Sequence, residues 1–184
     1  NAAKNNLKTL LVDEKNELGG ATIYQNREFN KIENQSSSDW IKKEIQELKN
    51  LNNLEIKTRT SVAAFHGYNY LLARENLTDH LEKKEKQGKI RQRLLKIRAK
   101  KVILATGALE RPLIFNNNDR PGIMLSSAVK KYADFYGVVS GKKNVFFTNN
   151  DSAYESALCL HNKGIKVEAV IDIRENSGSK IVKA

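Results

Sequence analysis

The chain has 184 residues, of which 40% are hydrophobic and 29% are charged, a composition typical of a folded rather than a disordered protein. It has no run of about 18 apolar residues that would span a membrane and no apolar N-terminal signal peptide, and its single cysteine excludes an internal disulfide, a CxxC redox pair and a cysteine-rich zinc site. Its 32 Lys and Arg against 21 Asp and Glu give a net charge of +11, and we expect a protein of the reducing cytoplasm.

The first part of the chain combines short apolar runs with one amphipathic helix. Residues 7–14 form an apolar run that ends in two acids, which predicts a buried parallel strand. Capping residues at 36–39 introduce a predicted helix over residues 40–51. Strand-like patterns follow at 54–65, 68–77 and 95–100, and a charged, glycine-containing connection is expected at 82–89.

The second part of the chain predicts a strand, helix and strand in succession. Residues 101–105 are expected to form another short buried strand, and residues 124–136 a helix. The pattern then predicts a strand at 145–148, a helix at 151–162 and a strand at 166–171. This order is the start of a βαβ unit, so the fold class is α/β.

Most of the positive charge lies in one stretch. Residues 82–101 contain ten Lys or Arg and two Glu, a net +8. Few aromatic side chains lie among them, and Lys outnumbers Arg, which does not favour nucleic-acid recognition. A solvated basic loop and a polyanion-binding site both remain open for this stretch.

The acidic end of the first strand suits a dinucleotide fold. A carboxylate at the end of the second strand of such a fold accepts hydrogen bonds from both hydroxyls of an adenosine ribose. Glu14, the last residue of the run, is the candidate, although acids commonly follow apolar strands for no functional reason. Gly19 and Gly20 then form either a plain turn or a loop over the ribose or pyrophosphate of the cofactor.

Two later strand ends carry small or polar residues. The strand at 101–105 runs into Thr106 and Gly107, where small residues let the backbone pass close to a cofactor, or simply make a tight turn. Residues 148–153 occupy the position of a Gly-x-Gly-x-x-Gly/Ala turn, but Thr148 and Asn150 replace the first two glycines. We therefore expect the fold element to be retained and its nucleotide site to be lost.

No catalytic or metal-binding residue can be assigned. The three histidines, His66, His80 and His161, are scattered and have no partner at ligand spacing, so no metal site is predicted. Cys159 lies on a predicted helix between Leu158 and Leu160, which favours burial over a nucleophilic role.

These pieces, in this order, resemble the flavoproteins that have two dinucleotide-binding domains. Residues 98–112, 118–125 and 147–154 more specifically resemble the alpha subunits of heterotetrameric sarcosine oxidases, as do residues 78–80 and 91–94. The string Thr-Asn-Asn-Asp-Ser-Ala-Tyr at 148–154 is distinctive, because generic relatives have glycines there. The resemblance covers nearly the whole chain.

The resemblance implies an oxidative demethylation. Enzymes of this family oxidise sarcosine to glycine at an FAD in the beta subunit, pass electrons through FMN to oxygen, release hydrogen peroxide and transfer the methyl carbon to tetrahydrofolate. Their alpha subunits carry NAD and assemble with beta, gamma and delta subunits. By this resemblance Glu14 binds the adenosine ribose, and Gly19, Gly20, Thr106 and Gly107 line the dinucleotide.

The resemblance also implies a glutathione-reductase-like, Rossmann-type fold with a β-rich insert. We expect residues 1–112 to be the back of a first dinucleotide-binding domain and residues 113–184 the start of a second, degenerate one. The fold is expected to be incomplete at both ends, because the glycine-rich loop and the folate-binding portion of the family have no counterpart in this sequence. We therefore expect the polypeptide alone to bind NAD weakly or not at all.

Two alternatives remain open. Related alpha subunits serve proline, hydroxyproline and opine dehydrogenases. A chain of this charge could also be a non-catalytic, basic interaction module that kept the fold without the nucleotide.

Overall fold

The computed structural model describes residues 1–24 and 31–175. The chain divides into two compact units. One combines Asn1–Ile23 with Ser37–Gly107, and the other combines Tyr24–Ser36 with Ala108–Ala184. The expected domain boundary at 112/113 lies a few residues after Gly107, but Tyr24–Ser36, which was expected in the first domain, groups with the second unit.

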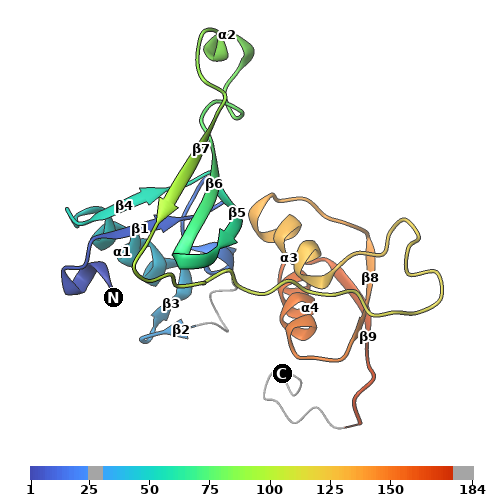
Figure 1. Ribbon diagram of the computed structural model, residues 1–184. Coiled ribbons are helices and arrows are strands. Elements are labelled where there is room, and N and C mark those ends of the chain that lie inside the picture. The colour runs from blue at the N-terminus through green and yellow to red at the C-terminus, as the bar shows by residue number, and fades with distance from the viewer. Residues whose placement is uncertain (25–30, 176–184) are drawn as a thin grey trace. The chain divides into compact units, whose positions relative to one another are not determined.

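A parallel strand pair forms the base of the first unit (Figure 1). Strand β1 (Thr9–Val12) pairs in register with β4 (Leu54–Lys57), and helix α1 (Ser37–Lys49) lies between them in the chain. A short 3₁₀ turn, η1 (Ala3–Asn5), precedes β1 and is tied to α1 by ion pairs from Lys4 to Glu44 and Glu47. The predicted parallel strand at 7–14 is thus confirmed over Thr9–Val12, although its residues are half-buried and not buried as expected. The predicted helix is confirmed with a start three residues earlier than expected.

An antiparallel sheet of three strands completes this unit (Figure 1). It is formed by β5 (Thr60–His66), β6 (Tyr70–Asn76) and β7 (Gln92–Arg98), in that order, with a single 3₁₀ turn, η3 (Gly67–Asn69), between the first two. Leu71 and Ala73 on β6 are buried. The long connection from β6 to β7 contains a four-residue helix, α2 (Lys83–Lys86), where the sequence predicted only a charged connection.

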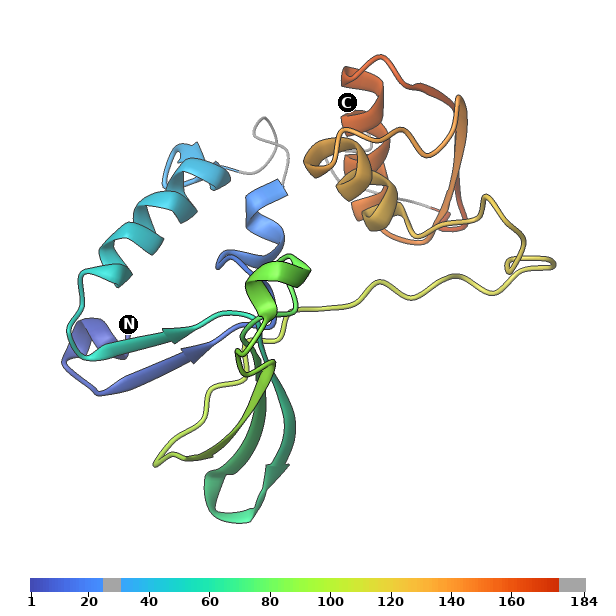
Figure 2. The ribbon, with the colours of Figure 1, turned by 90° about the horizontal axis from the view of Figure 1, so that it is seen from above.

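The second unit is built on a βαβ arrangement (Figure 2). Strands β8 (Lys143–Thr148) and β9 (Lys166–Asp172) are parallel, and α4 (Ser152–Asn162) connects them, as the sequence predicted. Helix α3 (Ser126–Phe135) packs on α4. The core combines side chains from both helices and β8: Ala133, Phe146, Ala153, Ala157 and Leu160. This unit also contains the short hairpin of β2 (Lys31–Ile32) and β3 (Gln35–Ser36).

The predicted buried strand at 101–105 is wrong. These residues are irregular, and Ile103 and Leu104 are 82% and 71% exposed. An apolar run becomes a strand only where a neighbouring strand forms backbone hydrogen bonds with it. Among the described residues, no strand pairs with residues 101–105.

The irregular segment that follows is anchored by Glu110. Its Oε1 accepts hydrogen bonds from the backbone N–H and the hydroxyl of Ser126 (3.2 and 2.8 Å), and its Oε2 accepts one from the backbone N–H of Ser127 (2.8 Å). Burial raises the pKa of Glu110, but the hydrogen bonds from Ser127 and Ser126 outweigh it and the pKa lies below its ordinary value. An ionised Glu110 therefore satisfies the first free amides of α3.

No helix in the described residues is long and apolar enough to cross a membrane. Within residues 1–24 and 31–175, no three His, Cys, Asp or Glu side chains gather as a metal site requires.

Candidate functional site

The two acids after β1 have different surroundings. Asp13 continues the parallel pairing, since its backbone N–H donates to Lys57 O and its carbonyl accepts from Thr60 N–H, both at 2.9 Å. Its carboxylate accepts the N–H of Lys15 at 2.9 Å and so closes the turn. Glu14 is exposed and makes no hydrogen bond or ion pair with another described residue. Glu14 is therefore the acid with a free carboxylate, and its predicted contact with a ribose stays a prediction.

Gly19 and Gly20 begin a 3₁₀ turn, η2 (Gly20–Tyr24). Gly19 has φ +118°, and a Cβ on it would lie 2.9 Å from Cγ1 of Ile23 and 3.1 Å from Cγ1 of Ile41. Close packing of this loop on α1 is by itself enough to require glycine at position 19. Gly20, with φ +56°, has open space where a side chain would be, and a role for either glycine in cofactor binding stays a prediction.

Thr106 and Gly107 lie at the end of the irregular segment that was predicted as a strand. Both are exposed, and neither makes a hydrogen bond with a described residue. Gly107 has φ +73°, a conformation that side chains disfavour, and nothing lies within 4 Å of the position of a Cβ. The first unit therefore contains a free carboxylate at Glu14 and an open glycine turn at Gly107, and the binding of a dinucleotide by either stays a prediction. No hydrogen bond among the described residues joins the two.

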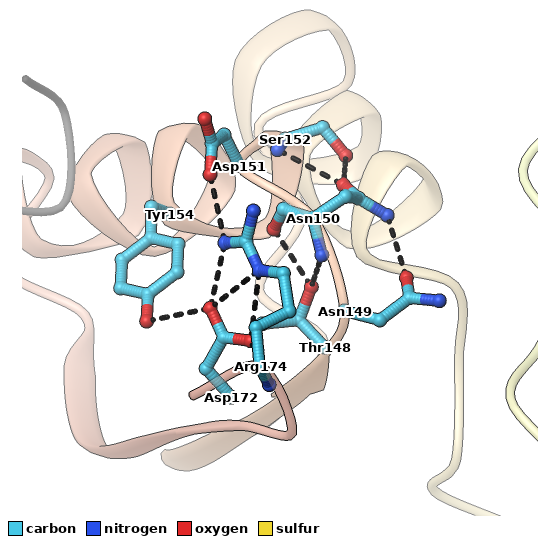
Figure 3. Close-up of polar contacts among 8 residues, drawn as sticks. All are labelled: Thr148, Asn149, Asn150, Asp151, Ser152, Tyr154, Asp172 and Arg174. Carbon is cyan, nitrogen blue, oxygen red and sulfur yellow. Dashed lines mark hydrogen bonds and ion pairs between the residues drawn. The ribbon is translucent and has the colours of Figure 1, made fainter. Parts of the chain in front are cut away.

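In the second unit, the turn from β8 to α4 is filled by its own polar side chains (Figure 3). The Thr148 hydroxyl donates to the carbonyl of Asn150 at 2.9 Å and accepts the N–H of Asn150 at 3.1 Å. The Asn150 amide oxygen accepts both the backbone N–H of Ser152 (3.0 Å) and its hydroxyl (2.6 Å). In a dinucleotide fold this is where the glycines and helix amides approach a pyrophosphate. Here a side-chain oxygen takes the first helix amide instead.

An ion cluster occupies the end of β9 beside this turn (Figure 3). Arg174 Nη2 donates to Asp172 Oδ2 and to Asp151 Oδ1, each at 2.7 Å, and Arg174 Nε also donates to both Asp172 oxygens. The Tyr154 hydroxyl donates to Asp172 Oδ2 at 3.1 Å. The Arg174 side chain and backbone N–H, and then Tyr154, hold the pKa of Asp172 well below its usual range.

Asp172 stands in the second unit where the sequence predicts Glu14 to stand in the first, at the end of the second strand of a dinucleotide fold. It ends the second strand of a βαβ unit, about twenty residues after the helix begins, which is where a ribose-binding acid stands. Its side chain is only 10% exposed, and its carboxylate is already bonded to Arg174 and Tyr154. Thus the two strand ends differ: the acid of the first is open, and the acid of the second is satisfied internally.

Sequence reasoning did not identify Asp172 or Arg174. The position of Asp172 at the end of the second predicted strand was an available signal, and it was applied to Glu14 alone. The partnership of Asp172 with Arg174, Asp151 and Tyr154 has no spacing signature, because it depends on how the turn before α4 and the end of β9 meet.

No family model matches the sequence, but three curated proteins, each named sarcosine oxidase subunit alpha, are similar to it. The chain is 40% identical over 173 residues to sarcosine oxidase subunit alpha of Corynebacterium sp. strain P-1, covering 94% of the chain and 18% of that protein. It is 38% identical over 183 residues to the subunit of the same name from Corynebacterium sp. strain U-96, covering 100% and 19%. The subunit from Rhizobium meliloti strain 1021 is 33% identical over 177 residues, covering 96% and 18%.

The chain is also similar to solved structures. The L-proline dehydrogenase of P. horikoshii matches with a TM-score of 0.65 and 25% identity, over 93% of this chain and 32% of the other. The chain thus spans less than a fifth of the length of its curated relatives, and about a third of the solved chain. The predicted resemblance to sarcosine oxidase alpha subunits is confirmed, and it covers nearly the whole chain.

Proposed function

We propose that this chain, a relative of sarcosine oxidase alpha subunits along nearly its whole length, is the dinucleotide-binding part of an amine-oxidising oxidoreductase. The observation that carries the proposal is an identity of 33–40% that extends across both units. Each unit contains a parallel strand pair with a helix between its strands in the chain, which agrees with a Rossmann-type fold in both.

The first unit is the cofactor-binding one, and NAD is the cofactor. The carboxylate of Glu14 is in position to accept hydrogen bonds from the adenosine ribose, because no other described group uses it. Gly19, Gly20, Thr106 and Gly107 line the dinucleotide, and the exposed turn at Gly107 leaves room for close approach. Bound NAD would occupy this site without accepting the electrons of the reaction, which the proposal assigns to FAD and FMN. The protein's own part is to bind and orient it.

The second unit has the same architecture without a nucleotide. Thr148, Asn150 and Ser152 hydrogen-bond to one another at the turn, and Arg174 holds Asp172. Displacing these contacts to admit a pyrophosphate and ribose would leave polar groups unpaired, which opposes binding. This unit serves as a structural counterpart of the first.

The reaction of the complete enzyme is the oxidative demethylation of sarcosine. Sarcosine, tetrahydrofolate and oxygen yield glycine, methylene-tetrahydrofolate and hydrogen peroxide. The amine carbon is oxidised at FAD in a beta subunit, FMN relays the electrons, and gamma and delta subunits complete a heterotetramer in the cytoplasm. No residue of this chain is assigned a catalytic role or a metal.

A second candidate is the alpha subunit of a proline, hydroxyproline or opine dehydrogenase. The similarity to an L-proline dehydrogenase over 93% of this chain favours it. The two candidates share the cofactor site and differ in the amine and in the electron acceptor.

The test is a substrate comparison with the assembled, full-length enzyme. Sarcosine, L-proline, hydroxyproline and an opine are compared by kcat/KM, with oxygen uptake and peroxide release measured together. The proposal predicts the highest kcat/KM with sarcosine, one peroxide per oxygen consumed, and methylene-tetrahydrofolate when tetrahydrofolate is present. Preference for proline without peroxide would assign the dehydrogenase, and inactivity with every amine would contradict both.

A further inference from the structure

The connection from β6 to β7 is held together at its base by an ion pair. The backbone N–H of Leu77 donates to the carbonyl of Arg91 at 3.0 Å and so closes the connection into a loop. Arg91 Nε donates to Asp79 Oδ1 at 2.6 Å, and Gln92 Nε2 donates to Asp79 Oδ2 at 3.1 Å. Thr78, next to Asp79, is 4% exposed. The far end of the loop is α2, the small helix beyond the sheet in Figure 1.

A shallow hollow of about 500 Å³, open to solvent, lies along this loop and is lined by three cations. Its lining residues are Thr78, Asp79, Lys86, Lys89 and Arg91. A turn brings the two lysines close, since Lys89 N–H donates to the carbonyl of Lys86 at 3.0 Å and Gly88 between them has φ +73°. Glycine at position 88 adopts this conformation without strain.

The side chains of Arg91, Lys86 and Lys89 each have N–H donors that no described residue uses, so these donors are available to a ligand. Asp79 balances one charge, that of Arg91, and the bond uses Nε, which leaves the terminal nitrogens of the guanidinium. Lys86 Nζ donates one of its three hydrogens, to the carbonyl of Asp79 at 3.1 Å. The Lys89 ammonium makes no hydrogen bond or ion pair with a described residue.

The nearby acids are committed elsewhere. Glu82 and Glu85 form a capping box at the start of α2, in which the side chain of each residue accepts the backbone N–H of the other. The N–H of Glu82 donates to Oε2 of Glu85 at 3.0 Å. Their carboxylates therefore serve the helix, and neither lines the hollow. Three cations against one acid leave a net positive site.

We propose that this hollow binds a small phosphate-type anion through Lys86, Lys89 and the outer guanidinium nitrogens of Arg91. A compact anion with several charged oxygens matches donors that converge from two lysines and a planar fork. A single-stranded nucleic acid matches less well, because residues 77–101 contain no Phe, Tyr or Trp on which a base could stack. The site is separate from the proposed NAD site and does not depend on it.

The experiment measures binding of pyrophosphate and of inorganic phosphate to the full-length protein by titration calorimetry. The double variant Lys86→Gln/Lys89→Gln removes two lining charges. The matched control Lys83→Gln/Lys84→Gln removes two charges from the same loop that do not line the hollow. Because a dinucleotide site also attracts pyrophosphate, the readout is the loss of one of the binding events seen with the unaltered protein. Lys89→Gln alone repeats the test while it keeps the hydrogen bond from Lys86 to the carbonyl of Asp79.

The proposal predicts that pyrophosphate binding at one site weakens about tenfold or more in the lining variant, in line with the loss of charged hydrogen bonds. The control variant should stay within about twofold of the unaltered protein, as expected for charges that act only through the screened field. Equal weakening in both double variants, unaltered binding in the lining variant, or tighter binding of heparin than of pyrophosphate at this loop would each overturn it. The last outcome would indicate a surface for long polyanions.

Discussion

At the scale of single residues, the two acidic strand ends show how a side chain's neighbours decide its use. Asp172 ends β9 and Glu14 lies two residues after β1, so each is at the end of a strand of a parallel pair. The sequence predicts that Glu14 takes the position of a ribose-binding acid. Arg174 lies two residues after Asp172 and binds it through several nitrogens, whereas Glu14 has no cation within the described residues. The charge-assisted, bidentate hydrogen bonds from Arg174 to Asp172 are stronger than the hydrogen bonds that neutral ribose hydroxyls would donate to the same carboxylate.

Cys159 gives a prediction that involves pH. Its side chain is 2% exposed, and its thiol donates to Asp134 Oδ2 at 3.1 Å. Burial, and then Asp134, raise the pKa of the thiol to about 12. The reactive thiolate is therefore scarce at pH 8, and we expect thiol modification in the native protein to be at least about a hundredfold slower than in denaturant.

The measurement is the rate of reaction with a thiol reagent between pH 7 and 10, in native and unfolded protein. Asp134→Asn should speed the native reaction, because it removes the negative charge that opposes thiolate formation, while Asp119→Asn, an exposed carboxylate elsewhere in the unit, should not. Native modification as fast as in denaturant would contradict burial of this thiol.

At the scale of elements, periodicity in the sequence predicts where helices and apolar runs lie, but not which runs pair with a neighbouring strand. The β8–α4–β9 arrangement was predictable, because its apolar residues recur with strand and helix periods and its turn lies where a βαβ turn should lie. The run at 101–105 has the same apolar pattern and forms no strand, because its pattern carries no information on a partner strand. Helix α2 was missed although Glu82 and Glu85 have capping-box spacing.

The exposed run at 101–105 makes a prediction about the full-length protein. Contiguous apolar side chains as exposed as Ile103 and Leu104 are unusual on a free surface, and the curated relatives are about five times as long as this chain. We expect another part of the full-length protein to bury them. Ile103→Asp should then lower the stability of the full-length protein by about 2 kcal/mol or more, because it buries an unpaired charge.

Thermal unfolding of the full-length protein measures this effect. Asn116→Asp introduces the same charge at an exposed polar position of the same irregular region and should leave the midpoint within about 1 °C. If the two variants unfold at the same temperature, Ile103 is as exposed in the full-length protein as it is here.

At the scale of the whole molecule, the proposed function assigns different roles to two units of similar plan. The candidate site residues predicted from the sequence, Glu14 through Gly107, all belong to the first unit. The charge of +11 is also concentrated there, in the loop and strand between residues 82 and 101. The second unit contributes a βαβ fold whose polar positions are bonded to one another. The turn at 148–153 predicted that the second unit lacks a nucleotide site, and the contacts of Asn150 and Asp172 agree with that prediction.

The most direct test of this account is the affinity of the full-length protein for NAD in two matched variants. Glu14→Gln and Asp172→Asn each replace one strand-end carboxylate by its amide. The account predicts that Glu14→Gln raises the Kd about tenfold, because charged hydrogen bonds to the ribose become neutral, and that Asp172→Asn leaves it within about twofold. Weaker NAD binding in Asp172→Asn with unchanged binding in Glu14→Gln would contradict the account and assign the nucleotide to the second unit.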